Sequence, residues 1–227
     1  MQRNHTNLGP LRTVLTNFLV GILMLAMGLS LWWLARGTSA EAWWHSSSIH
    51  AARICGLFGA VEMASASWMM YMGSAKPRRQ NAVLVALFAW LIVLVLQVSA
   101  MFMAHDEASL WNVSSETRLQ VLLAGVAMWL VASSLPAFLP GDAPPGLRAM
   151  WRTTRTLFLV QLALAAFRLA PERYDLVGLA IAHGPRAPML AIAWVAFTAP
   201  WVHALWSVRR TLRAYVRREG LLKSAVT

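Results

Sequence analysis

Long apolar runs alternate with short polar segments along the whole chain. Each run is long enough for a helix to cross the hydrocarbon core of a bilayer, which takes about 20 residues. A backbone in lipid must form its hydrogen bonds internally, so these runs are predicted to be α-helices. The predicted spans cover about residues 14–35, 54–73, 82–104, 121–139, 156–170 and 189–208. The pattern predicts an all-α integral membrane protein, a six-transmembrane-helix bundle with short loops.

Lysine and arginine residues gather on alternate sides of these predicted spans. Fourteen of the 20 lie in the N-terminal segment, in the loops after the second and fourth spans, and in the C-terminal tail. Cytoplasmic loops carry the excess of Lys and Arg, so both termini are predicted to be cytoplasmic. Residues 1–227 are interpreted as a single transmembrane domain that ends in a basic cytoplasmic tail, residues 209–227. The short loops favour a bacterial inner membrane.

Composition agrees with this interpretation and narrows the partners. Hydrophobic residues make up 58% of the chain and charged residues 13%, whereas soluble domains carry about 25% charged residues. The net charge of +11 lies in short loops and one tail beside apolar runs, a distribution that argues against nucleic-acid binding. The expected partners are membrane lipids, above all the anionic inner leaflet, which attracts basic residues near its surface.

Glu62 lies in the middle of the second predicted span. A carboxylate there costs several kcal/mol unless it is paired, hydrated or protonated. Counting about 1.5 Å per residue, Gln97 and Arg168 lie at a comparable depth. The three residues therefore form a candidate intramembrane polar site, which would bind a proton or a small solute. The alternative is a structural pair that holds the helices together.

Gly56, Ala60 and Ala64 recur at intervals of four in the second span. Small residues at this spacing let two membrane helices approach closely. The second span is therefore predicted to be central in the bundle.

Two cofactor hypotheses concern the outer face. Soft thioethers and imidazoles suit Cu(I), and Met101, His105, His45 and His50 fall on that face in the predicted topology. A haem held by two histidines at one depth is the second hypothesis, and His50 with His105 is its candidate pair. Packing methionines and interfacial histidines are the alternative for all four residues.

Pro200 interrupts the sixth predicted span. It removes one backbone hydrogen bond, so a kink is predicted there. The kink would either shape helix packing or form the wall of a gate.

No phosphate-binding glycine loop, paired-histidine motif or cysteine pair is present in the sequence. The leading hypothesis is therefore a non-catalytic subunit that packs within a larger membrane assembly, with other membrane-protein subunits as partners. A transporter or channel for a small solute or ion, using the intramembrane polar site, is the first alternative. A membrane redox subunit with haem or copper at the outer face is the second.

Overall fold

A computed structural model describes residues 8–36, 43–73, 77–103, 110–139, 143–166 and 187–224. Nearly all of these residues lie in helices, and no strand occurs among them. The elements are α1 (Leu8–Arg36), α2 (Trp43–Met72), α3 (Pro77–Met103), α4 (Leu110–Ser134), the short 3-10 helix η2 (Leu135–Ala137), α5 (Pro145–Ala166) and α7 (Ala187–Ser224).

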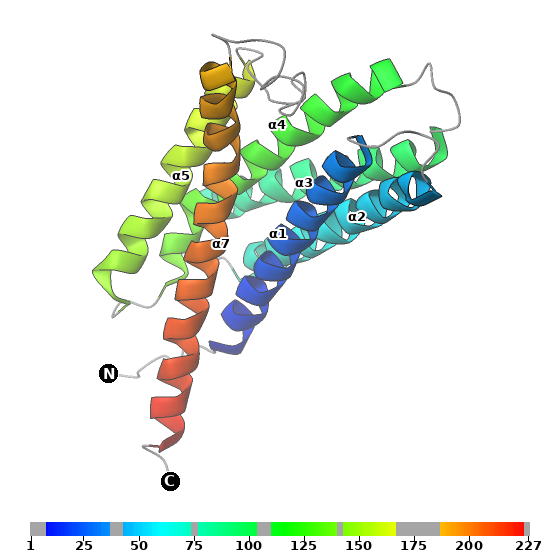
Figure 1. Cartoon of the computed structure of the whole chain (residues 1–227). Coiled ribbons are helices and arrows are strands. Elements are labelled where there is room, and N and C mark those ends of the chain that lie inside the picture. Colours follow the sequence, from blue (N-terminus) through cyan, green and yellow to red (C-terminus); the bar gives the residue numbers. More distant parts are fainter. Residues whose placement is uncertain are drawn as a thin grey trace.

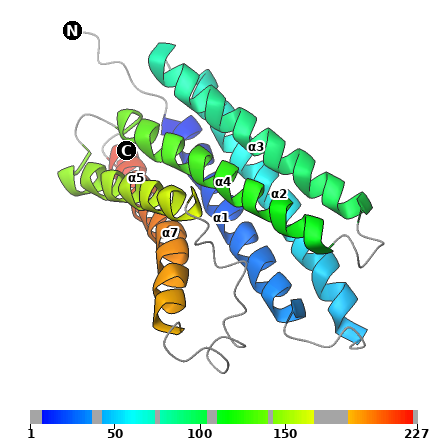
Figure 2. The ribbon, with the colours of Figure 1, turned by 90° about the horizontal axis from the view of Figure 1, so that it is seen from above.

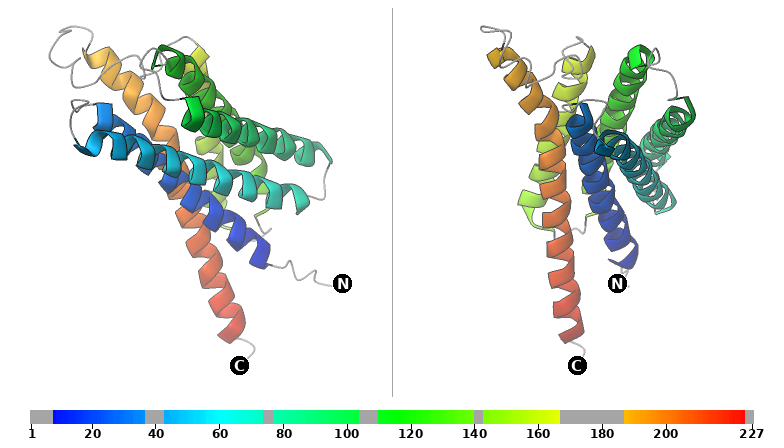
Figure 3. Two further views of the ribbon diagram at one scale, coloured as in Figure 1. Left: turned by 90° about the vertical axis from the view of Figure 1, so that its right-hand side faces the viewer. Right: turned by 45° about the vertical axis from the view of Figure 1, so that its right-hand side comes forward.

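The α-helices run alternately up and down, so that the start of α1 and the end of α7 lie toward the same end of the bundle (Figure 1). Each α-helix packs against its neighbours in the chain, and α1 also packs against α7. These contacts close the helices into a ring. Figure 2 shows the helices from above. The helix α7 continues well past the start of α1 (Figure 3).

Local sequence explains several helix ends. Both α3 and α5 begin with proline, which suits a first helical position because its backbone angle is preset and it needs no hydrogen-bond acceptor. The helix α2 ends at a turn in which the backbone N–H of Gly73 donates to the carbonyl of Met69. The helix α4 ends before Pro136, and the chain continues as η2.

Three of the described helices are long and apolar enough to cross a membrane. The qualifying stretches are Leu11–Gly28 in α1, Arg79–Ser99 in α3 and Leu119–Ala137, which covers the end of α4 and η2. The expectation of an all-helical chain with membrane-capable helices is confirmed for the described residues.

Several helix boundaries differ from the predicted spans. The helix α2 begins at Trp43 rather than near residue 54, and α7 runs on to Ser224 rather than ending near residue 208. An apolar run marks the part of a helix that suits lipid, whereas the helical hydrogen bonds continue through polar flanks. The predicted fourth helix is too long at its end, because Pro136 converts its last residues into η2.

The buried side chains of the described residues concentrate in one half of the bundle, toward the start of α1 and the end of α7. Most of this core comes from residues 14–22, 60–70, 83–93, 124–139, 147–158 and 204–215. Its largest fully buried side chains are those of Trp90, Trp151, Phe18 and Phe158. Because lipid tails are as apolar as these side chains, close packing rather than water exclusion holds such a core together in a membrane.

Glycines allow α1 and α2 to approach closely. A Cβ atom added to Gly28 would lie 2.8 Å from the backbone carbonyl oxygen of Ala52. A Cβ atom added to Gly21 would lie 2.8 Å from the side chain of Met63, and one added to Gly59 would lie 2.7 Å from that of Leu25. The glycine backbones therefore contact both backbone and side-chain atoms of the opposite helix. The neighbour of Gly28 is a backbone oxygen, which can move less than the side chains of Met63 and Leu25.

Substituting Gly28 with Ala should destabilise the bundle. The overlap with the Ala52 carbonyl should cost about 1–3 kcal/mol, partly offset by the helix preference of Ala, which is worth up to about 1 kcal/mol. We expect a lower thermal unfolding midpoint in mild detergent, by about 2–4 °C for each kcal/mol lost. Gly146→Ala is the control, because an added Cβ there meets nothing within 4 Å. Equal midpoints for the two variants would contradict the close α1–α2 packing.

Candidate functional site

Glu62 lies in the middle of α2, half-buried, at the border of an exposed apolar stripe. Phe58 precedes it by four residues and is therefore its neighbour on the helix surface, and the side chain of Phe58 is 57% exposed. The adjacent Val61 is 41% exposed. No hydrogen bond or ion pair joins Glu62 to another residue in the described ranges. Its carboxylate is therefore at the edge of the bundle rather than in its centre.

Gln97 makes its polar contact elsewhere. Its side-chain Nε2 donates a hydrogen bond to Oε1 of Gln120 at 2.9 Å, which links α3 to α4. Its amide also packs against Gly56, where an added Cβ would lie 3.2 Å from three of its atoms. Glu62 follows Gly56 by six residues, which places the two about 120° apart around α2.

The structure thus brings Gln97 to Gln120 on one side of α2, with Glu62 turned toward another. Arg168 lies outside the described residues, so the three-residue polar site stays a prediction. Gln120 was overlooked because it immediately precedes the predicted fourth span. In the predicted topology Gln120 and Gln97 lie at comparable depths in the membrane, on neighbouring antiparallel helices. This match in depth was the signal that could have identified Gln120.

The small residues predicted to pack on α2, namely Gly56, Ala60 and Ala64, are all buried. Gly56 lies between two helices. Its amide nitrogen would be 3.2 Å from a Cβ added to Gly28 of α1, and its own Cα faces the amide of Gln97 in α3. The sequence did not predict a packing role for Gly21, Gly28 or Gly59, which belong to the closest α1–α2 contact.

A chain of hydrogen bonds links α5 to α7 in the half of the bundle that holds the core. Thr154 Oγ1 lies 2.9 Å from His203 Nδ1 and 3.0 Å from Ser207 Oγ. Near the start of α5, Trp151 Nε1 donates to Thr211 Oγ1 at 3.1 Å. All of these side chains are buried except that of His203, which is partly exposed.

The donors and acceptors of this network can be accounted for. The hydroxyl of Thr154 donates to the carbonyl of Met150 at 3.1 Å, and that of Thr211 donates to the carbonyl of Ser207 at 2.7 Å. Thr154 Oγ1, Ser207 Oγ and His203 Nδ1 form a triangle of contacts, since Ser207 Oγ also lies 3.4 Å from Nδ1. A proton on Nδ1 would make His203 a donor to these hydroxyls, and a proton on Nε2 would make Nδ1 their acceptor.

Sequence reasoning missed most of this network. The fifth span was predicted to begin at residue 156, which placed Trp151 and Thr154 in a loop, because Arg152 and Arg155 interrupt the apolar pattern. In the structure these arginines are exposed while Trp151 and Thr154 are buried on another face of α5. The stripe of polar residues at positions 203, 207 and 211 of the neighbouring helix was the signal that could have revealed the pairing.

Pro200 lies inside α7 and is buried, where it withholds the N–H that the carbonyl of Ala196 would otherwise accept. On the facing helix α5, Phe158 makes an edge-to-face contact with Trp201, with ring centroids 5.2 Å apart. Gln161 follows one turn further along α5, and since the two helices are antiparallel it lies at the level just before Pro200. Its side chain is 2% exposed, and its Oε1 has no hydrogen-bond partner among the residues that the structure describes.

The predicted outer metal residues are placed only in part. His50 is exposed on α2. His45 and Met101 lie on α2 and α3, with side chains that are not described, and His105 lies outside the described residues. The described residues contain no group of three His, Cys, Asp or Glu side chains able to hold a metal. The copper and haem hypotheses stay predictions.

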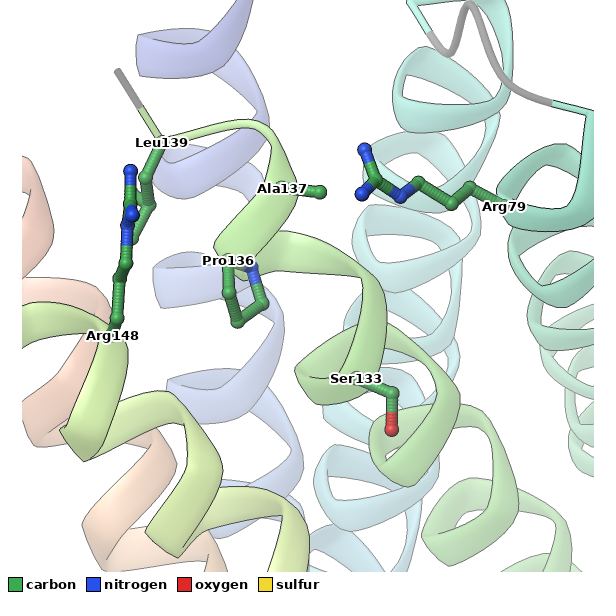
Figure 4. Close-up of a pocket in the computed structure, with 6 residues that line it drawn as sticks. All are labelled: Arg79, Ser133, Pro136, Ala137, Leu139 and Arg148. Carbon is green, nitrogen blue, oxygen red and sulfur yellow. The ribbon is translucent and has the colours of Figure 1, made fainter. Parts of the chain in front are cut away.

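A cavity opens at the end of the bundle where α4 gives way to η2. It has a volume of about 380 Å³ and is lined by Arg79, Ser133, Pro136, Ala137, Leu139 and Arg148. In Figure 4 the guanidinium of Arg79 extends from α3 toward Ala137, and that of Arg148 stands beside Leu139. Two cations from separate helices therefore flank one turn of the chain.

Replacing Thr154 with Val should destabilise the α5–α7 contact. The change removes a hydrogen-bond partner of both Ser207 and His203, and each buried polar group left without a partner costs about 1–3 kcal/mol. The control is Thr153→Val, because Thr153 is exposed and its hydroxyl bonds only the carbonyl of Ala149, at 3.3 Å. Thermal unfolding in detergent should separate the two variants, and a Thr154→Val midpoint as high as that of the control would contradict the network.

Comparison with known proteins identifies no relative, because no family model, curated protein or solved structure matches the chain. The functional argument therefore depends on the residues themselves. They present a half-buried carboxylate at the edge of α2, a polar network between α5 and α7, and a basic cavity at one end. They also include a buried amide oxygen, that of Gln161, without a partner among the described residues.

Proposed function

We propose that this chain is a multi-pass protein of a bacterial inner membrane and a non-catalytic subunit of a larger membrane assembly. In this proposal its α-helices cross the bilayer six times, with both termini in the cytoplasm. The alternating direction of the helices (Figure 1) supports an even number of crossings. The concentration of Lys and Arg at the end that holds the start of α1 and the end of α7 supports the orientation.

The surface of α2 and α3 supports membrane residence. Large apolar side chains are exposed along both helices: Ile54, Phe58, Val61, Trp68 and Met72 on α2, and Val85, Phe88, Leu91, Ile92, Val95 and Val98 on α3. A soluble monomer rarely exposes so continuous an apolar surface. The same surface is favourable in contact with lipid tails or with another membrane helix.

The end of α7 supports the proposed depth. The ring of Trp206 is half-exposed and packs edge-on against His203, with centroids 5.5 Å apart. The guanidinium carbon of Arg210 lies 4.9 Å from the centroid of the same ring. Tryptophan and arginine prefer the zone where lipid headgroups meet the hydrocarbon core. This part of α7 therefore suits the inner membrane surface, and the basic residues beyond it suit the cytoplasm.

The carboxylate of Glu62 is the observation on which the subunit proposal depends. It lies mid-helix beside the exposed Phe58 and Val61, where lipid would surround a charge at a cost of several kcal/mol. A neighbouring helix that supplies a basic or hydrogen-bond-donating side chain would remove that cost. A two-fold dimer through this face would instead bring two Glu62 carboxylates toward each other. The partner is therefore a helix of a different polypeptide.

Glu62→Leu should release the chain from its assembly. Losing one member of a desolvated charge pair costs about 2–5 kcal/mol, so the fraction of chain that migrates in a complex larger than its own 25.1 kDa should fall more than tenfold. Glu62→Gln keeps a hydrogen-bond acceptor and should lose less. Native electrophoresis of mild-detergent extracts measures the fraction.

A photocrosslinker placed at Phe58 should join the chain to its partner, whereas one at Leu159 should not. Leu159 is also exposed but lies on α5, which is not a neighbour of α2 in the ring. A wild-type chain that migrates alone from both detergent and native lipid discs would contradict the subunit proposal.

A transporter or channel for a small ion is the second candidate, and the proline within α7 favours it. Oε1 of Gln161 has no partner among the described residues, and Pro200 leaves a backbone carbonyl of α7 without its helical donor, so that two oxygens lie near one level of the bundle. Interrupted membrane helices use such oxygens to coordinate a dehydrated cation. This candidate uses Gln161 in place of the predicted group of Glu62, Gln97 and Arg168.

If transport is the function, Gln161→Leu should lower the uptake of sodium or rubidium ions into proteoliposomes at least tenfold. Gln120→Leu is the matched control, because Gln120 bonds Gln97 between α3 and α4 and does not face the kink. Uptake no faster than in protein-free vesicles, for both ions and for the wild type, would remove this candidate.

A further inference from the structure

One face of α7 points away from the rest of the bundle. Its exposed side chains form what we call the α7 stripe: Val195, Val202, Trp206, Arg209, Arg210 and Arg213. Because each residue of an α-helix is turned by about 100° from the last, these six fall within about 100° of one another around the axis. The buried Ala204, Ser207 and Thr211 occupy the opposite side of the helix, where α7 packs against α5 and α1.

The chemistry of the α7 stripe changes in one direction along the helix. It begins with valines that are 57% and 65% exposed, continues with the half-exposed Trp206 and ends with three exposed arginines. At about 1.5 Å of rise per residue, Arg209 and Arg213 lie about 5 Å and about 11 Å beyond Trp206. An apolar, then aromatic, then cationic surface follows the order of acyl chain, glycerol and phosphate in a phospholipid that stands beside the helix.

The guanidinium of Arg210 is directed back toward the apolar part of the α7 stripe. Its central carbon lies 4.9 Å from the centroid of the Trp206 ring, one turn nearer the start of α7. This direction agrees with the tilt of helical side chains toward the N-terminus of their helix. The contact with the ring is a cation–π interaction, which supplies no oxygen acceptor. The N–H donors of Arg210 therefore remain for an anion.

The arginines of the α7 stripe are neighbours on one helix surface. Arg213 follows Arg209 by four residues and Arg210 by three, the spacings that bring side chains together. Among the side chains that the structure describes, the one carboxylate is that of Glu62, in the middle of α2. The paired N–H donors of a guanidinium match two oxygens of a phosphate. These cations are therefore suited to converge on one phosphate from the same side.

The proposed topology, on which this step rests, places Trp206 and these arginines at the inner membrane surface. Basic residues that follow a membrane helix there attract anionic phospholipids. We propose that the α7 stripe binds one anionic phospholipid, with its phosphate at Arg210 and Arg213 and an acyl chain along Val195 and Val202. An acidic protein segment would meet the arginines but would gain nothing from the exposed valines. The bound lipid would hold α7 at a fixed depth.

Lipid binding to the full chain, purified in mild detergent, tests the proposal. Phosphatidylglycerol or phosphatidylcholine is added to the micelles, and native mass spectrometry counts the lipids retained. The pair Arg210→Gln and Arg213→Gln should lose more than tenfold in affinity for phosphatidylglycerol, since each basic residue beside an anionic headgroup contributes about fivefold. The control pair is Arg152→Gln with Arg155→Gln, which removes the same charge from an exposed face of α5. The control should change the affinity less than threefold, and an equal loss in both pairs would overturn the proposal.

Trp206→Leu tests the site without changing the charge of the protein. It removes the ring that holds the guanidinium of Arg210, so the affinity for phosphatidylglycerol should fall at least threefold. Trp206→Phe keeps an aromatic ring and should lose less. Equal affinities of the Leu variant and the wild type would overturn the proposal, because attraction by net charge alone would then explain the binding.

Two further outcomes concern other occupants of the α7 stripe. Complete displacement of the lipid by an excess of inorganic phosphate would overturn the lipid assignment, since a free anion does not replace the acyl-chain contact. An unfolding midpoint of the Arg210→Gln and Arg213→Gln pair equal to that of the wild type in phosphatidylcholine micelles shows that the variant is folded. Full lipid binding by that folded variant would overturn the proposal and leave the arginines to an acidic protein partner.

A separate measurement tests the topology. Arg217 is exposed on α7 one turn beyond Arg213. Arg217→Cys in a Cys55→Ala background, labelled with a membrane-impermeant maleimide in sealed vesicles of known orientation, should react only from the cytoplasmic side. Labelling from the outer side would overturn the proposed orientation, whereas the micelle measurement does not depend on orientation. Failure of the lipid site and failure of the topology are therefore distinguishable.

Discussion

The close contact of α1 with α2 is the constraint on which much of the bundle depends. Backbone meets backbone there, because Gly28 leaves no atom between itself and the carbonyl of Ala52. The helix α1 also packs against α7, so its distance from α2 decides whether the ring of helices can close. Gly56 extends the contact outward, since it borders α1 on one side and leaves room for the amide of Gln97 on the other.

Polar side chains in this bundle have different structural roles, which depend on whether they lie between helices or at the bundle edge. Between α5 and α7, Trp151, Thr154, Ser207 and Thr211 satisfy one another in a buried network that fixes the rotation of the two helices. The pair of Gln97 and Gln120 does the same between α3 and α4. Glu62 is different, because it lies at the bundle edge and has no bond to another described residue. A satisfied group stabilises the fold, whereas a group at the edge points to contacts outside it.

The proposals fit together as one view of a protein specialised for contact with its surroundings. In the proposed function, the exposed stripes of α2 and α3 adjoin lipid or protein, and Glu62 faces a partner helix. The buried Gln161 near the level of Pro200 is the feature that this view explains least, and it is the reason that ion transport remains the second candidate. Each of these surfaces is formed by residues from at least two turns of helix, and none depends on a catalytic group.

The sequence alone determined the class of the structure, because helix-forming apolar runs longer than a soluble core requires are visible without any tertiary contact. It also indicated that Glu62 is exceptional and that Gly56, Ala60 and Ala64 are suited to packing. It could not determine which helices meet, since hydropathy records the length of an apolar run but not the rotation of a helix about its axis. Only the tertiary structure decided that Gln97 faces Gln120, that Trp151 and Thr154 belong to α5 and face α7, and that Arg79 and Arg148 border one cavity. Those pairings join residues between 23 and 69 positions apart, and the packing of neighbouring helices is the physical factor that selects them.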